Sequence, residues 1–299
     1  KKNNFLLNGN GEFLIQKNYD KVYYKIEKSD KEYLFDAKLN FIKNPIHLSF
    51  LNYKSDKDSL SNLKLNGKFL KNKTLSLKKI KFENDSDLIS FKNLELTDNL
   101  KVSQLNSAIF DYTDTQNKKN NFQVKQDGKN FIISGKTFNA SKLIEDLIFE
   151  DNKNRDIFDK NYSIILDLDE VYLHEDDVVY DLDGNLNFIN NEITNATINS
   201  KFNDNEKISF TLISKNNQKV TTFYSDQAKP FVKKFNFIKG FEKGSLDFYS
   251  VKTKDMTNSK LKIYDFNLKE LPALTKILTL ASLQGIADVL SGEGIGFSE

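Results

Sequence analysis

Apolar and polar residues alternate along most of the chain, which predicts β-strands with one dry face and one solvated face. The first clear runs place apolar residues at every second position: Tyr33, Phe35, Ala37, Leu39 and Phe41, then Leu63, Leu65, Gly67 and Phe69. Later runs are Val178, Tyr180, Leu182, Gly184, Leu186 and Phe188, then Ala196, Ile198, Ser200 and Phe202, and Ile208, Phe210 and Leu212. Polar turn clusters at 54–58, 203–206 and 216–218 separate the runs, so the pattern predicts an antiparallel meander.

Three stretches follow helical spacing instead. Residues 138–149 offer Asn139 as an N-cap, and residues 226–237 begin with the capping acid Asp226. Residues 271–290 open with Pro272 in the first turn and stop before Ser291 and Gly292. The polar segment 150–161 separates two similar halves, so we expect a sheet-rich half at 1–150 and a second at 162–299. The predicted fold is mainly β with a few helices: a curved antiparallel sheet with an apolar helix near the C-terminus.

Composition excludes several classes of function. The chain has 299 residues, and its 38% hydrophobic content is enough for a folded core. Its 44 basic and 42 acidic residues are interspersed, which argues against a nucleic-acid partner. The absence of cysteine excludes disulfides, a thiolate nucleophile and a cysteine-ligated zinc.

Candidate chemistry is sparse. His47 lies in the strand-like run 46–53, and His174 lies in an acidic stretch that contains Asp167, Asp169, Glu170 and 175–177. Oxygen ligands at that density suit Ca²⁺, but a solvated strand edge kept from mispairing by its acids is the favoured interpretation. Residues 181–192 resemble a calcium loop but have Leu186 where the turn needs glycine, so a strand is favoured there too. We therefore predict no enzyme activity, no cofactor and no metal.

The segment 271–290 is also the strongest candidate for a membrane span. Lys276, Gln284 and Asp288 interrupt it, and the uncharged stretch 277–287 is too short to cross a bilayer. Its apolar residues extend nearly all around a helix, so we expect a buried helix that lies in or across the sheet's dry face and plugs or gates it.

The same segment closely resembles the AsmA-like C-terminal domain family. The resemblance rests on the proline-led run 271–295, with its Leu280-Ala281-Ser282-Leu283 core and Ser291-Gly292-Glu293-Gly294 end. It extends to residues 225–246, although Lys243-Gly244 stands where the family has two glycines, and to the strand entering a helix at 133–139. The match is clearest over residues 225–296, whereas the first 130 residues share only the general style of the family.

The resemblance implies a fragment of a Gram-negative envelope protein that lies in the periplasm. An N-terminal helix absent from this chain would anchor it in the inner membrane. It implies a β-groove that conducts phospholipid toward the outer membrane, with an assembly scaffold for outer-membrane biogenesis as the alternative. The partners would be lipid acyl chains, and the family supplies no catalytic residues. The candidate groove residues are Tyr33, Phe35, Leu39, Leu63, Leu65, Phe69, Tyr180, Leu186, Phe188, Ile198, Phe202, Phe210, Leu274, Leu278 and Leu280.

Overall fold

The computed structural model describes residues 4–15, 18–29, 31–56, 59–70, 74–143, 158, 161–174, 176–235, 240–268 and 295–297. Most of these residues lie in β-strands, which confirms the prediction of a mainly β fold with curved sheet structure. The chain divides into two compact units. The first comprises Lys1–Glu175 with Asn187–Ile193, and the second comprises Asp176–Leu186 with Thr194–Glu299.

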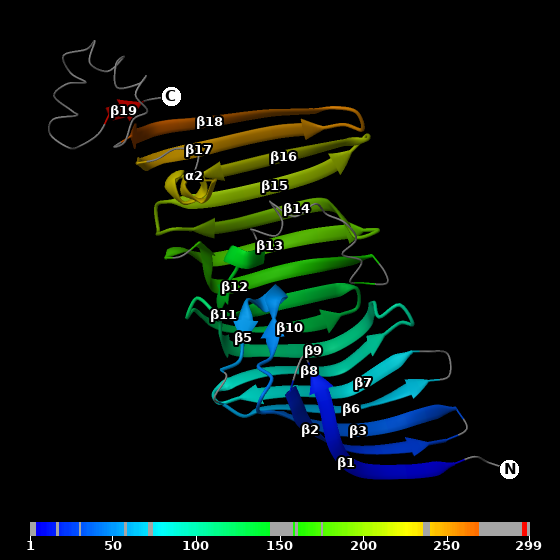
Figure 1. Ribbon diagram of the computed structural model, residues 1–299. Coiled ribbons are helices and arrows are strands. Elements are labelled where there is room, and N and C mark those ends of the chain that lie inside the picture. Colours follow the sequence, from blue (N-terminus) through cyan, green and yellow to red (C-terminus); the bar gives the residue numbers. More distant parts are fainter. Residues whose placement is uncertain are drawn as a thin grey trace. The chain divides into compact units, whose positions relative to one another are not determined.

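The sheet of the first unit follows chain order (Figure 1). Its strands are β1 (Phe5–Ile15), β2 (Asn18–Lys28), β3 (Glu32–Phe41), β6 (Ser61–Leu70), β7 (Leu75–Asn84), β8 (Asp87–Leu96), β9 (Val102–Thr113), β10 (Lys119–Asp127), β11 (Asn130–Asn139) and β12 (Tyr162–His174). From β1 to β11 each strand pairs antiparallel with the next, as the alternation predicts.

The last pairing of this sheet corrects the prediction of a purely antiparallel meander. Strands β11 and β12 run parallel, with Phe131 beside Ile164 and Gly135 beside Leu168. Parallel neighbours need a crossover connection of a dozen residues or more, and residues 140–161 provide that length. The rings of Phe131 and Tyr162, at the start of these two strands, both contact Phe158 of the connection, with centroids 4.6 and 4.2 Å away.

A short hairpin leaves the sheet between β3 and β6. It consists of β4 (His47–Leu48), the 3₁₀ turn η1 (Ser49–Leu51) and β5 (Tyr53–Lys54), and it lies in front of the sheet in Figure 1. The predicted strand at 46–53 is therefore wrong, because Asn52 adopts a left-handed conformation (φ 51°) and reverses the chain. His47 is exposed on this hairpin.

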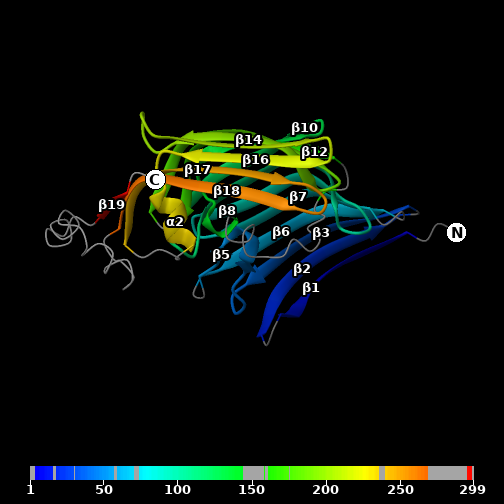
Figure 2. The ribbon, with the colours of Figure 1, turned by 90° about the horizontal axis from the view of Figure 1, so that it is seen from above.

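The second unit contains most of β13 (Asp177–Ile189) and β14 (Glu192–Lys201). Its other elements are β15 (Lys207–Lys215), β16 (Gln218–Ser225), α2 (Lys229–Phe235), β17 (Phe241–Lys252), β18 (Thr257–Leu268) and β19 (Ile295–Phe297). From β14 to β19 the pairing is antiparallel. Helix α2 lies against β17 (Figure 2), where Ala228 and Val232 are buried with Phe241 and Leu246.

The predicted helices are shorter than expected where the structure describes them. Strand β11 continues through Phe138, and a helical turn follows only at 141–143. Asn139, the last residue of β11, accepts a hydrogen bond at Oδ1 from the backbone N–H of Ser141 (3.1 Å), which is the kind of bond that an N-cap side chain makes. Asp226 does not cap α2, because its carboxylate accepts hydrogen bonds from Lys207 N and from the Tyr224 hydroxyl. The predicted helix 271–290 lies outside the described residues.

Asp20 ties the chain that leaves β3 to strand β2. Its carboxylate is 3% exposed and accepts hydrogen bonds from the backbone N–H groups of Ile42, Lys43 and Asn44 and from the Asn44 amide. Burial acts to raise the pKa of Asp20, but these hydrogen bonds outweigh it and hold the pKa below its usual value. The ionised form is therefore the one that stabilises the fold.

We expect Asp20→Asn to lower the free energy of unfolding at pH 7 by about 2 kcal/mol, because the amide turns one acceptor oxygen into a donor facing other donors. Because the pKa of Asp20 is lower in the folded chain than in the unfolded chain, the stabilisation is complete at pH values above the unfolded pKa. It is lost as the pH falls through the folded pKa. The difference between variant and parent should therefore shrink below about pH 4. Urea denaturation at pH 7 and pH 3 measures it, and Asp98→Asn, at an exposed turn position, is the control. A difference independent of pH would contradict the assignment.

Candidate functional site

The main candidate site is the apolar face of the first unit, where side chains from different strands align in rows. The middle row crosses nine strands in unbroken register: Tyr24, Ala37, Leu65, Ile80, Phe91, Ala108, Val124, Ile133 and Leu166. Since neighbouring strands lie about 4.8 Å apart, this row is about 38 Å long. It contains no charged residue.

Two further rows flank it on the same face. One consists of Val22, Leu39, Leu63, Phe82, Ile89, Phe110, Phe122, Gly135 and Leu168. The other consists of Ile26, Phe35, Gly67, Leu77, Leu94 and Leu105. Together the three rows form a continuous apolar strip, hereafter the apolar strip.

Paired bulges keep the apolar strip in phase. Strict alternation would send Leu77 and Ile80 to opposite faces, because they are three residues apart. Lys78 is an extra residue in β7, between the pairs Leu77–Gly67 and Lys79–Asn66, and it restores both apolar side chains to one face. In β8, Asn93 has a φ of 50°, and Phe91 and Leu94, which are also three residues apart, pair with Ile80 and Leu77 of the strip.

Exposure changes along the apolar strip. Its residues on β2, β3 and β6 are half-buried, whereas Phe82, Ile89 and Phe110 further along are buried. Part of this cover comes from the β4–β5 hairpin: the ring of Tyr53 meets Phe82 and Tyr112 edge-on, and Tyr112 donates a hydrogen bond to Leu51 O (3.0 Å). The strip is thus accessible at the β2–β6 end and filled like a core beneath the hairpin.

The second unit has its own apolar rows. One runs through Ile198, Phe210, Phe223, Phe248 and Leu261. Helix α2 covers part of this face, since Phe223 and Phe248 pack against the cluster of Ala228, Val232, Phe241 and Leu246. Ile198 and Phe210 are half-buried on strands β14 and β15.

The candidate groove residues lie in several different parts of the two units. Phe35, Leu39, Leu63 and Leu65 lie in the three rows of the first unit, and Tyr33 and Phe69 form a cross-strand pair at their margin. Leu186, Ile198 and Phe210 lie half-buried in the second unit, and Phe188 stacks on Tyr162 at 4.5 Å in the first. Phe202 lies in the turn after β14. Leu274, Leu278 and Leu280 lie outside the described residues.

Tyr180 departs from the predicted alternation. Val179, its neighbour, is completely buried, whereas Tyr180 is 40% exposed. The φ of 49° at Asp181 marks an irregularity that shifts the alternation of β13 by one residue, so that Leu182 and Leu186 follow the face of Val179. Tyr180 therefore lies on the solvent side.

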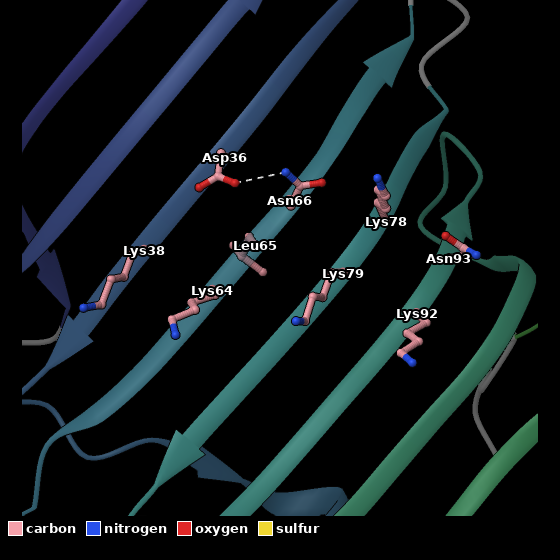
Figure 3. A pocket seen from close by; sticks show the side chains of 9 residues that line it. All are labelled: Asp36, Lys38, Lys64, Leu65, Asn66, Lys78, Lys79, Lys92 and Asn93. Carbon is pink, nitrogen blue, oxygen red and sulfur yellow. Dashed lines mark hydrogen bonds between the residues drawn. The ribbon is translucent and has the colours of Figure 1, made fainter.

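A second feature, which the sequence does not reveal, is a shallow depression of about 700 Å³ on the polar face of the first unit. Five lysines line it, and Figure 3 shows four of them in a row, one on each of the strands β3, β6, β7 and β8. These four are Lys38, Lys64, Lys79 and Lys92, and Lys78 is the fifth. The only lining carboxylate is that of Asp36, which accepts a hydrogen bond from the Asn66 amide (3.0 Å). The depression that these five lysines line is hereafter called the lysine depression.

Reactive constellations are scarce among the described residues. They contain no group of three His, Asp or Glu side chains placed to hold a metal ion. The acidic stretch around His174 forms the end of β12 and the start of β13, and Asp167 and Asp169 are exposed there. Burial raises the pKa of Tyr53, Tyr112 and Tyr162, to about 12 for Tyr162, so these phenols stay protonated at neutral pH and serve as core residues.

No family model, curated protein or solved structure matches the chain. The resemblance to the AsmA-like family and its implications therefore stay predictions. Among the described residues, no helix is long and apolar enough to cross a membrane.

Proposed function

We propose that the chain is a non-enzymatic, periplasmic part of an AsmA-like envelope protein that conducts phospholipid between the inner and outer membranes. The observation that carries this proposal is the apolar strip of the first unit, whose middle row crosses nine strands without a charged residue. A path for lipid needs such a continuous dry surface and needs no reactive side chain.

The energetics favour this use of the strip. Burying acyl carbons gains about 0.8 kcal/mol per CH₂, so one chain gains on the order of 10 kcal/mol when it leaves water for an apolar surface. Aliphatic and aromatic side chains recur from strand to strand, so successive positions have similar energy and a chain can slide. The half-buried side chains on β2, β3 and β6 provide the accessible entry.

A scaffold role in outer-membrane assembly is the second candidate. It is favoured by the places where the apolar face is filled. Tyr53 is fully buried over the first unit's sheet, and α2 buries Val232 over the second. A face filled in this way along its whole length would be an ordinary core with no room for lipid.

A photoactivatable phospholipid with its reactive group in the acyl chain separates the two candidates. We expect crosslinks at the half-buried residues Leu65, Ile80 and Phe91 of the middle row, mapped by mass spectrometry. Ser90 and Lys81, on the opposite face of the same strands, serve as internal controls. Equal crosslinking on both faces, or no crosslinks in the middle row, would contradict lipid conduction and favour the scaffold role.

A further inference from the structure

The lysine depression concentrates like charge at positions where strand pairing makes it unfavourable. Lys38 lies directly opposite Lys64, and Lys79 lies directly opposite Lys92. Like charges at directly opposed cross-strand positions destabilise a sheet. The fold therefore carries two such pairs side by side, which points to a role other than stability.

Acidic side chains of the protein neutralise the charge of these lysines only in part. Glu83 lies 3.7 Å from Lys64 and also pairs with Lys81. Among the described residues, Lys38, Lys78, Lys79 and Lys92 have no carboxylate within ion-pair distance. The depression therefore presents unneutralised ammonium groups to solvent and is complementary to an anionic partner.

The depression lies on the face opposite the apolar strip. Lys64 neighbours Leu65, Lys79 neighbours Ile80 and Lys92 neighbours Phe91, and successive side chains of a strand point to opposite faces. An anion held by these lysines is therefore not the headgroup of a lipid whose chain lies on the strip. Binding at the lysines is therefore independent of the proposed lipid path.

The shape of the site favours a surface as the partner. Small-molecule sites enclose most of their ligand, whereas this depression is shallow and spreads over four strands. Tyr23, directly opposite Lys38 in the adjoining strand β2, is 43% exposed. A tyrosine beside lysines is a combination suited to a membrane–water interface, where the ring meets the headgroup region.

A nucleic acid fits the observations less well. Non-specific binding of single strands needs a basic groove that tracks the backbone together with aromatic rings for stacking. Here the row of directly opposed lysines gives way to Tyr23 on β2 and Ser107 on β9, Asp36 lies among the lysines, and the net charge of the whole chain is only +2.

We propose that the lysine depression docks the first unit on a bilayer surface that exposes anionic phospholipid headgroups. Each lysine near such a surface is worth about a fivefold gain in affinity. The attraction acts within a Debye length, about 8 Å at physiological ionic strength, so it orients the protein only once it is close to the membrane.

The test is co-sedimentation of the whole chain with vesicles of phosphatidylglycerol and phosphatidylcholine. The triple variant Lys38→Gln, Lys79→Gln, Lys92→Gln should bind about 100-fold more weakly than the parent. Glutamine keeps most of the side-chain length and relieves the like-charge pairs, so a melting temperature at or above that of the parent should show intact folding. The matched control removes three exposed lysines from the second unit, Lys252, Lys254 and Lys260.

Four other arms decide the partner. Binding should be lost on vesicles of phosphatidylcholine alone and should weaken as NaCl rises. Equal loss in the control triple would overturn the proposal, because net charge rather than this site would then explain binding. Displacement from vesicles by millimolar tripolyphosphate through the same lysines would assign the site to soluble phosphates. Displacement by a single-stranded oligonucleotide at lower concentration than tripolyphosphate would assign it to nucleic acid. In both cases the membrane assignment fails, while the acyl-chain crosslinking result is unaffected.

Discussion

Gly135→Ala is expected to destabilise the first unit by about 3 kcal/mol. Gly135 lies where β10 meets β11 at a bulge, and the register shifts between Phe122–Gly135 and Asn121–Thr137. A Cβ atom at Gly135 would lie 2.4 Å from Asn121 O and 2.5 Å from Phe122 Cα. Both are backbone atoms, so relief requires the two strands to separate, and the free energy of unfolding from urea titration measures the loss.

Gly11→Ala is the matched control for this substitution. Gly11 also lies in a strand, β1, but a Cβ there meets nothing within 4 Å. Its replacement should be neutral or stabilise slightly, by up to about 1 kcal/mol, because alanine restricts the unfolded chain more than glycine does. Similar effects of the two substitutions would show that the close approach of strands at Gly135 is not what that glycine serves.

The strands could be predicted because the alternation of apolar and polar residues within each strand shows which residues share a face. In β3 and β6 the apolar residues at every second position, from Tyr33 to Phe41 and from Leu63 to Phe69, lie on one face as the alternation requires. Antiparallel pairing of sequential strands follows from the short polar turns between them. The mainly β fold could therefore be predicted from the sequence.

Irregularities within the strands could not be predicted from the sequence. A bulge adds one residue, such as Lys78, and no composition marks it, so alternation read through it places Leu77 and Ile80 on different faces. The same limit put Tyr180 on the wrong face of β13. The parallel pairing of β11 with β12 depends on the path of the connection, which periodicity does not encode.

The two additions to the candidate site arise from contacts distant in sequence. Tyr53 reads as one more strand residue, and only its contacts with Phe82 and Tyr112 reveal it as cover for the apolar strip. Lys38 and Lys92 are separated by 54 positions in charge-balanced sequence, and only the register of four strands gathers them. A search for lysines at outward positions of consecutive strands would have raised the possibility without fixing the alignment.

Lipid storage and lipid conduction make different demands on the apolar strip. Stored lipid needs only some apolar surface, so one altered strand leaves most of the site intact. A conducted lipid must pass every strand in turn, so its rate is set by the least favourable position. A single carboxylate in the middle row therefore separates the two, because it interrupts the path while leaving most of the binding surface.

Ile80→Asp should slow phospholipid transfer between donor and acceptor vesicles by about 100-fold, measured by fluorescence dequenching. A passing chain would lose apolar contact for about four CH₂ groups at roughly 0.8 kcal/mol each, a barrier of about 3 kcal/mol and two powers of ten in rate. Ile80 is half-buried, so the carboxylate keeps access to water and the fold should persist, as circular dichroism would verify. The Ile80→Leu variant should transfer phospholipid at the parental rate. The Ser90→Asp variant, changed on the polar face of the next strand, should also transfer at that rate. Crosslinking of the photoactivatable lipid at Leu65 should survive in Ile80→Asp. Transfer that continues at the parental rate in the folded variant would rule out conduction along this row and favour the scaffold role.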